Sequence, residues 1–290
     1  MKIYGLFAAK FAGVWLALII GQIAGGVIGQ MVAHAATPAF KQDGPFDLMT
    51  AVILSSGLYG LVLSAVASQM RQGFWGRMAV AFLLLYVLES GLSEVEAIYF
   101  NTYLHMSNSL LFSMAIGAVI KAAIAGLVCA LLWRGTGDPA ERFSGLVWKI
   151  PLISLLYVVF YFGAGALIAW QSADVRAYYA QGFDIDQKQL ALLQVGRGLI
   201  WALLAWLSVA SLTGGTWRRA LLTGLAFSIL MALPLLYPNP LMPWPVRSVH
   251  LVEVGVSNFL FGIVAALILL RGVGAKRDHG APHLTTSPRS

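Results

Sequence analysis

The chain has 290 residues, of which 59% are hydrophobic and only 11% are charged. A soluble domain has roughly 25% charged residues, so this composition excludes that class. The net charge of +7 does not indicate a nucleic-acid partner, because the basic residues gather on one side of a predicted membrane bundle. The single cysteine, Cys129, excludes an intramolecular disulfide and is expected to be a small buried hydrophobe.

Long apolar runs dominate the sequence. A helix of about 20 apolar residues crosses the hydrocarbon core of a bilayer. Because a helix satisfies its own backbone polar groups, such runs predict an all-α integral membrane protein in contact with the lipid bilayer. There are eight: 5–33, 47–69, 78–99, 107–133, 148–170, 189–212, 219–237 and 247–270.

The first run carries a stripe of small residues spaced four apart. Its members are Gly13, Ala17, Gly21, Gly25 and Gly29. Such a stripe keeps one helix face flat, so that another helix can approach closely. The partner is either a helix of the same bundle or a second copy in a homo-oligomer.

The same run ends at Ala33-His34-Ala35, which loosely resembles the cleavage site of a secretory signal. Its apolar part is longer than the hydrophobic region of an ordinary signal. We therefore expect the first helix to be retained.

Six charged residues lie inside the predicted spans: Glu89, Glu94, Glu96, Lys121, Arg197 and Glu253. Each costs about 2.5–3.5 kcal/mol near the bilayer centre, so such residues usually face the bundle interior. In an α-helix Glu89, Ser93 and Glu96 share one face, whereas Glu94 points nearly the opposite way and is expected to reach the interface. Four carboxylates face two fixed cations, and an unpaired buried carboxylate binds a proton or a cation.

Two connections resemble each other. The segments GFWGRM at 73–78 and GTWRRA at 215–220 match Gly, Trp and Arg at one offset, and LLWRG at 131–135 resembles LILLRG at 267–272. Four helices in each half predict a parallel 4+4 internal repeat with its axis along the membrane normal. The predicted parts are 1–135, 136–273 and a polar tail, 274–290, which is expected to be disordered in the cytoplasm.

The segment AWQSADVRAYY, 169–179, ends the fifth span. Trp170 and Gln171 close the helix, and Arg176, Tyr178 and Tyr179 lie just outside it. These side chains form either the mouth of a cavity or an ordinary amphipathic surface turn.

The last span begins with PVRSVHLVEVGVSNFLFG, 245–262. Arg247, His250 and Asn258 form one stripe, with Glu253 on its flank. Together with the charges of the other spans they predict a water-filled cleft in the outer half of the membrane, with Lys121 deeper. The cavity candidates are Glu89, Glu96, Lys121, Arg197, Arg247, His250, Glu253 and Asn258. The alternative is an internal salt-bridge network that only fixes helix packing.

Lysine and arginine set the predicted orientation. If the N-terminus is cytoplasmic, the only connecting residues of this kind on the opposite side are Lys41, Arg176, Lys188 and Arg247. This distribution follows the positive-inside rule. It predicts a multi-pass protein of the cytoplasmic (inner) membrane with both termini in the cytoplasm.

Three classes of function remain open. A transporter or channel would use Glu89 and Glu253 as a proton or cation relay, His250 as a group that titrates near neutral pH, and Arg197 with Lys121 to hold an anionic group. The ligand would then be a small molecule or an ion.

A membrane-embedded enzyme could use His250 and Glu253, spaced i, i+3, as metal ligands completed by Glu89 and Glu96. The sequence has no H-E-x-x-H, G-x-S-x-G or phosphate-loop motif and names no cofactor. A scaffold or assembly subunit is the third class, because no strong motif stands against it.

Overall fold

The computed structural model describes residues 2–36, 42–181 and 186–273. Within these ranges every regular element is helical, and eight spans are long and apolar enough to cross a membrane. They are α1 (Lys2–Ala33), α2 (Leu48–Ala67), α3 (Phe74–Tyr86) with η1 (Val87–Gly91) and α4 (Leu92–Tyr99), α6 (Asn108–Leu132), α7 (Leu146–Leu167) with η2 (Ala169–Gln171), α9 (Gln187–Ser211), α10 (Thr216–Ala232) with η3 (Leu233–Leu236), and α11 (Trp244–Leu270). The predicted fold class and eight spans are confirmed. The predicted disordered tail, 274–290, lies outside the described residues.

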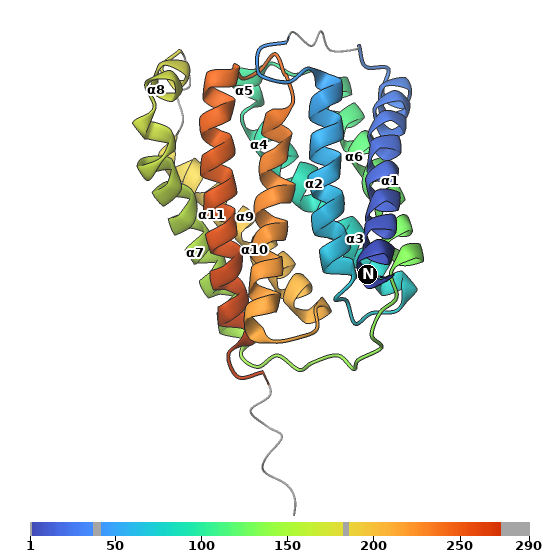
Figure 1. Ribbon diagram of the computed structural model, residues 1–290. Coiled ribbons are helices and arrows are strands. Elements are labelled where there is room, and N and C mark those ends of the chain that lie inside the picture. Colours follow the sequence, from blue (N-terminus) through green and yellow to red (C-terminus); the bar gives the residue numbers. More distant parts are fainter. Residues whose placement is uncertain (1, 37–41, 182–185, 274–290) are drawn as a thin grey trace, which may run out of the picture.

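The two ends of the bundle differ. The chain enters α1 and leaves α11 at the same end (Figure 1), which we call the N/C end. The opposite end carries the short helices α5 (Asn101–Leu104) and α8 (Ala173–Tyr179), and we call it the α8 end. An even number of spans requires that both termini lie on one side.

Polar caps fix several helix starts at the α8 end. The Asp47 carboxylate accepts from the Thr50 amide at 2.8 Å, and the Asp186 carboxylate accepts from the Lys188 amide at 2.8 Å. Such side-chain oxygens satisfy backbone N–H groups that have no partner within the helix. The helices α2 and α9 therefore begin directly after these residues, within two residues of the predicted spans.

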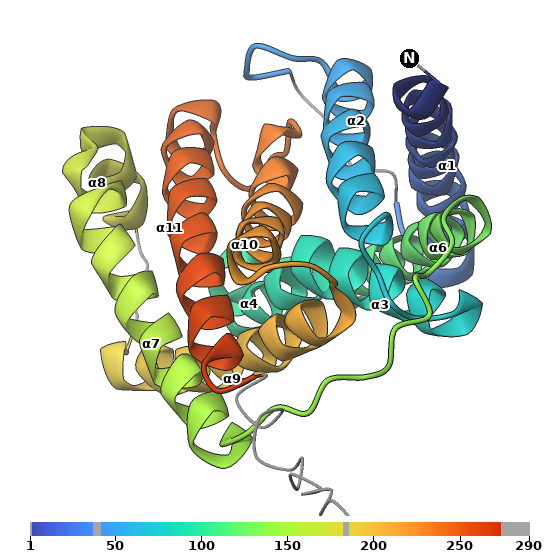
Figure 2. The same cartoon turned by 60° about the horizontal axis from the view of Figure 1, so that its bottom comes forward.

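The glycine stripe packs α1 against α6 of the same chain (Figure 2). A Cβ at Gly25 would lie 2.4 Å from the Gly117 carbonyl oxygen, and one at Gly29 would lie 2.4 Å from that of Ser113. A Cβ at Gly13 would meet Leu132. Of the two uses expected for the stripe, the structure shows packing within the bundle. Because α6 covers this face, the same glycines are not free to contact a second copy.

A π-helical turn, η1, interrupts the third span. A π-turn holds one more residue than an α-turn, and it rotates the residues that follow by about 100°. Glu89 lies inside η1 and Glu96 lies beyond it. The expectation that these two carboxylates share a face is therefore wrong: Glu89 contacts Lys121 of α6, whereas Glu96 contacts Arg197 of α9.

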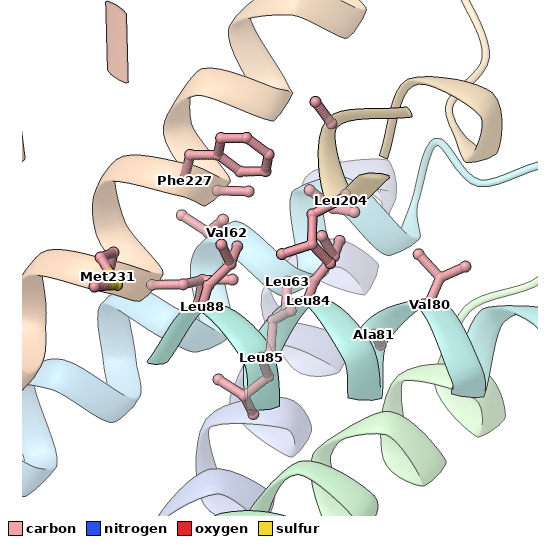
Figure 3. Packing of buried hydrophobic residues seen from close by; sticks show 14 of the residues in the cluster. Val62, Leu63, Val80, Ala81, Leu84, Leu85, Leu88, Leu204, Phe227 and Met231 are labelled. Carbon is pink, nitrogen blue, oxygen red and sulfur yellow. The ribbon is translucent and has the colours of Figure 1, made fainter. Parts of the chain in front are cut away.

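The first four spans meet the last four across an apolar layer (Figure 3). Its side chains come from α2, α3, η1, α9 and α10 and include Val62, Leu63, Leu84, Leu88, Leu204, Phe227 and Met231. Where this apolar surface would otherwise be in contact with water, its burial stabilises the packing of the two groups of helices by about 25 cal/mol per Å². In lipid the same side chains contribute close packing instead.

The two groups also meet at the N/C end. Met70 and Leu212 form an isolated antiparallel bridge. The Arg71 amide donates to the Ser211 carbonyl at 2.9 Å, and the Thr213 amide donates to the Gln69 carbonyl at 2.8 Å. The connections that follow α2 and α9 are thus hydrogen-bonded to each other.

Glu141 fastens the long connection between α6 and α7 to this junction. Its Oε1 accepts from Arg71 at 3.0 Å, and its Oε2 accepts from Arg219 at 2.8 Å. Burial raises the pKa of the Glu141 carboxyl, but the hydrogen bonds and charges of Arg219 and Arg71 outweigh burial and hold this pKa below its usual range. Glu141 therefore joins the α6–α7 connection to both groups of helices at the N/C end.

Candidate functional site

Within the described residues, three ion pairs join two side chains that both belong to the spans: Glu89 with Lys121, Glu96 with Arg197, and Glu253 with His250. The sequence predicted that Glu89, Arg197, His250 and Glu253 would meet. The structure pairs Arg197 with Glu96 and His250 with Glu253, and it places Glu89 in a separate cluster with Lys121.

The Glu89–Lys121 pair is closed. Each side chain is 6% exposed. Lys121 Nζ also donates to Gln22 Oε1 of α1 at 2.8 Å, and Ser90 donates to Glu89 Oε2 at 2.9 Å. The ammonium lies 5.9 Å from the centre of the Tyr59 ring. Every partner is supplied by the protein itself, as in the salt-bridge network that the sequence left as an alternative. Lys121 was expected deeper than the other charges, but its long stem brings the ammonium to Glu89.

The second cluster joins five elements, and we call it the acid–tyrosine cluster. It consists of Glu96 of α4, Tyr157 and Tyr161 of α7, Tyr179 of α8, Gln194 and Arg197 of α9, and His250 and Glu253 of α11. Arg197 Nη1 donates to both Glu96 Oε1 and Gln194 Oε1, the latter at 2.8 Å. Gln194 Nε2 donates to Glu96 Oε1 at 3.3 Å.

His250 and Glu253 form the other half of this cluster. His250 Nδ1 lies 2.5 Å from Glu253 Oε2, and His250 Nε2 lies 3.4 Å from the Tyr179 hydroxyl. The Tyr179 ring packs near Trp170, with ring centres 5.7 Å apart. A helical spacing of three brings His250 and Glu253 together on one face of α11, as predicted.

Tyrosines connect the two ion pairs. Tyr157 interacts electrostatically with Arg197, Glu96 and Glu253, and Tyr179 interacts with Glu96 and Glu253. Burial raises the pKa of the Tyr179 hydroxyl, and the charges of Glu96 and Glu253 raise it further. Tyr179 therefore contacts His250, and Tyr157 and Tyr179 lie near enough to Glu253 to interact with its charge.

Gly165 of α7 leaves room beside Glu253. The nearest atoms to a Cβ there would be Glu253 Oε1, at 3.7 Å, and two atoms of the Trp170 ring, at 3.8 Å and 4.0 Å. His250 contacts only Oε2 of Glu253, and Arg197 and Gln194 donate only to Oε1 of Glu96. Within the described residues Glu253 Oε1 and Glu96 Oε2 are therefore carboxylate oxygens without a hydrogen bond from the protein.

No family model matches the sequence, and no curated protein or solved structure matches the chain. Function therefore has to be inferred from the chemistry of the site. The His250–Glu253 pair can exchange a proton with a ligand or with water. The Glu96–Arg197–Gln194 group offers a positioned carboxylate.

Arg247 is held away from the acid–tyrosine cluster. It is fully buried and binds both oxygens of Asp43, at 2.8 Å and 2.9 Å, and the Met242 carbonyl at 2.6 Å. The hydrogen bond from Arg247 lowers the pKa of the Asp43 carboxyl. Arg247 thus clamps the connection before α2 to the start of α11. It does not line an open polar stripe, which corrects the expectation from helical periodicity.

Asn258 and Glu94 also differ from expectation. Asn258 is buried, and in the described part of the chain no hydrogen bond joins it to an ion pair. Glu94 does not reach the interface freely: its Oε1 is buried without a hydrogen-bond partner, and its Oε2 accepts from Tyr86 at 3.4 Å. The rotation introduced by η1 accounts for the position of Glu94.

The structure offers little support for a metal centre. Among the described residues, no three His, Cys, Asp or Glu side chains gather where they could hold a metal ion. A zinc site needs three or four protein ligands. His250 and Glu253 supply two and are bonded to each other.

The segment 169–179 lies at the cluster. Val175 is buried, and the Tyr178 hydroxyl donates to the Leu241 carbonyl at 2.7 Å, so α8 packs against the chain near the start of α11. This packing brings Tyr179 to His250.

Proposed function

We propose that the protein is a proton-coupled carrier of a small solute and that the acid–tyrosine cluster is its binding site. The supporting observation is that the Glu96–Arg197 and His250–Glu253 pairs, which come from three spans, both lie near Tyr157 and Tyr179. Each charge near the bilayer centre costs about 2.5–3.5 kcal/mol. A packing role accounts for the closed Glu89–Lys121 pair, but it does not account for the partly exposed Glu96 and Glu253.

The proposed orientation places the N/C end in the cytoplasm of the cell and the α8 end outside the cytoplasmic membrane. It is supported by the basic residues of the N/C connections, which include Arg71, Arg134, Arg142 and Arg218. The acid–tyrosine cluster would then be reached from the outside.

We further propose that the two halves are a duplicated unit. Gly73 and Gly215 match in sequence, and at the same offset Met70 matches Leu212. These two residues form the antiparallel bridge, and its hydrogen bonds are reciprocal under the same offset. An antiparallel bridge has a local two-fold axis. In the proposed carrier the halves would rock about this junction, as in transporters built from repeats.

The proposed role of Glu253 is to hold a proton when the site is empty and to give it up in exchange for the solute. When the solute binds, the His250–Glu253 pair would release one proton toward water, and when the solute leaves, the pair would take one up. Solute and proton would therefore occupy the site alternately, which couples their movements.

The test is solute-driven proton movement in proteoliposomes that contain a pH-sensitive dye. Tetraethylammonium, glycine betaine and succinate represent cationic, zwitterionic and anionic solutes. We expect at least one of them to move protons with the wild type, a loss of at least tenfold in E253Q, and little change in E94Q, a carboxylate outside the cluster. No proton movement with any solute, or an unchanged E253Q, would contradict the carrier.

A further inference from the structure

The acid is the more exposed member of the asymmetric ion pairs. Glu96 is 25% exposed, whereas Arg197 is 2% exposed. At the α8 end Asp43 is 27% exposed and Arg247 is fully buried. A ligand that reaches either pair meets carboxylate oxygen rather than guanidinium.

The guanidinium of Arg197 is already engaged. Its Nη1 donates to Glu96 and Gln194, and its Cζ lies 5.9 Å from the centre of the Tyr157 ring. Its Nε is buried, and the side chain as a whole is 2% exposed. Little of the Arg197 guanidinium is therefore open to an anionic solute, and Lys121 is closed off by Glu89 and Gln22.

Aromatic rings lie near His250 and Glu253. Trp170 and Tyr179 pack together beside His250, and Tyr161 lies one turn from Tyr157 along α7. The faces of such rings attract cations at distances up to about 6 Å. Gly165 leaves space between Trp170 and Glu253 Oε1. The nearby Arg176 is exposed, but its guanidinium is bound to the Trp170 carbonyl at 2.6 Å.

We infer that the acid–tyrosine cluster binds an organic cation, with its positive charge between Glu96 and Glu253 and its alkyl or aryl groups against Trp170 and the tyrosines. This inference rests on the proposed function for the placement of the solute in the cluster. It adds the chemical class of the solute, an amine or quaternary ammonium compound, and it excludes anions as the preferred ligand.

The experiment is equilibrium dialysis of the purified protein with radiolabelled tetraethylammonium and tetraphenylphosphonium. We expect saturable binding of at least one cation to the wild type, an affinity at least tenfold weaker in E96Q and in E253Q, and an unchanged affinity in E94Q. The W170A variant, which removes one ring, is expected to bind about threefold more weakly or worse. An excess of succinate should not compete.

The variants are compared only where their elution from size-exclusion chromatography matches that of the wild type. If E96Q fails this criterion, E96D replaces it and is expected to retain binding, because it keeps the carboxylate. Binding of neither cation, equal binding to E253Q, or competition by succinate would overturn the inference.

These outcomes distinguish the inferred class of ligand from the proposed carrier function. If a zwitterionic or anionic solute drives Glu253-dependent proton movement while neither cation binds, the carrier stands and the solute class is wrong. If a cation binds through Glu253 but no solute moves protons, the binding site stands and the carrier is wrong.

Discussion

Replacing Lys121 with Met is expected to lower the free energy of unfolding by about 3–5 kcal/mol. The substitution removes the partner of Glu89 and leaves its carboxylate 6% exposed among α1, α2 and α6. It also removes the bond to Gln22, which ties α1 to α6. The measurement is a denaturation curve of the purified protein in mixed micelles.

The double variant E89Q/K121M provides the control. It removes both charges and leaves groups of similar volume, so we expect it to be more stable than K121M alone. If K121M is as stable as the double variant, Glu89 and Lys121 are not coupled, and the closed pair has no structural role.

Replacing Gly25 with Leu is expected to have the second largest effect. A Cβ at this position would lie 2.4 Å from the Gly117 carbonyl oxygen. This neighbour is backbone and cannot move aside, so α1 must separate from α6. We expect a loss of at least about 3 kcal/mol, the upper part of the range for overpacking, in the same denaturation assay.

The adjacent glycine supplies a matched control. A Cβ at Gly26 would meet nothing within 4 Å. The G26L variant has the same change in composition and helix propensity, so it is expected to differ from the wild type by less than about 1 kcal/mol. Equal effects of G25L and G26L would show that propensity, rather than contact with α6, determines the loss.

The eight spans could be predicted from the sequence because hydropathy over about 20 residues is a strong signal in a membrane helix. Apolar character predicted the ends of the spans less accurately. The helices α10 and α11 each begin three residues before the predicted span, because a helix continues through polar residues until its cap or a proline. Asp47 and Asp186 carry the usual signal for a helix start.

The partners of the charges were harder to predict. The turn η1 changed the faces of Glu94 and Glu96, and a π-turn has no clear sequence signature beyond the Ser90-Gly91 pair. Asp43, the partner of Arg247, lies in an irregular connection, where helical periodicity gives no direction. Contacts between residues so distant in sequence depend on tertiary packing that a single sequence does not specify.

Some members of the acid–tyrosine cluster can be recognised from their helical spacing in the sequence. Gln194 precedes Arg197 by three residues, and Tyr157 precedes Tyr161 by four, so each pair shares a helix face. Gln22 interrupts an apolar helix on the small-residue face, which indicates a buried polar partner. Polar residues at helical spacing around an intramembrane charge therefore indicate a buried polar cluster as strongly as the charges themselves.

The proposed binding site requires that water from outside the cell reaches the acid–tyrosine cluster. The most direct measurement is labelling of G165C in intact cells with a membrane-impermeant thiol reagent, which reacts with a thiolate in water. The wild type is a suitable blank, because its single cysteine, Cys129, is fully buried. We predict that G165C is labelled from outside. We predict that G26C, which lies on a face of α1 where a Cβ has no neighbour within 4 Å, is not labelled. Labelling of G165C only after the cytoplasmic side is exposed, or no labelling at all, would contradict the claim.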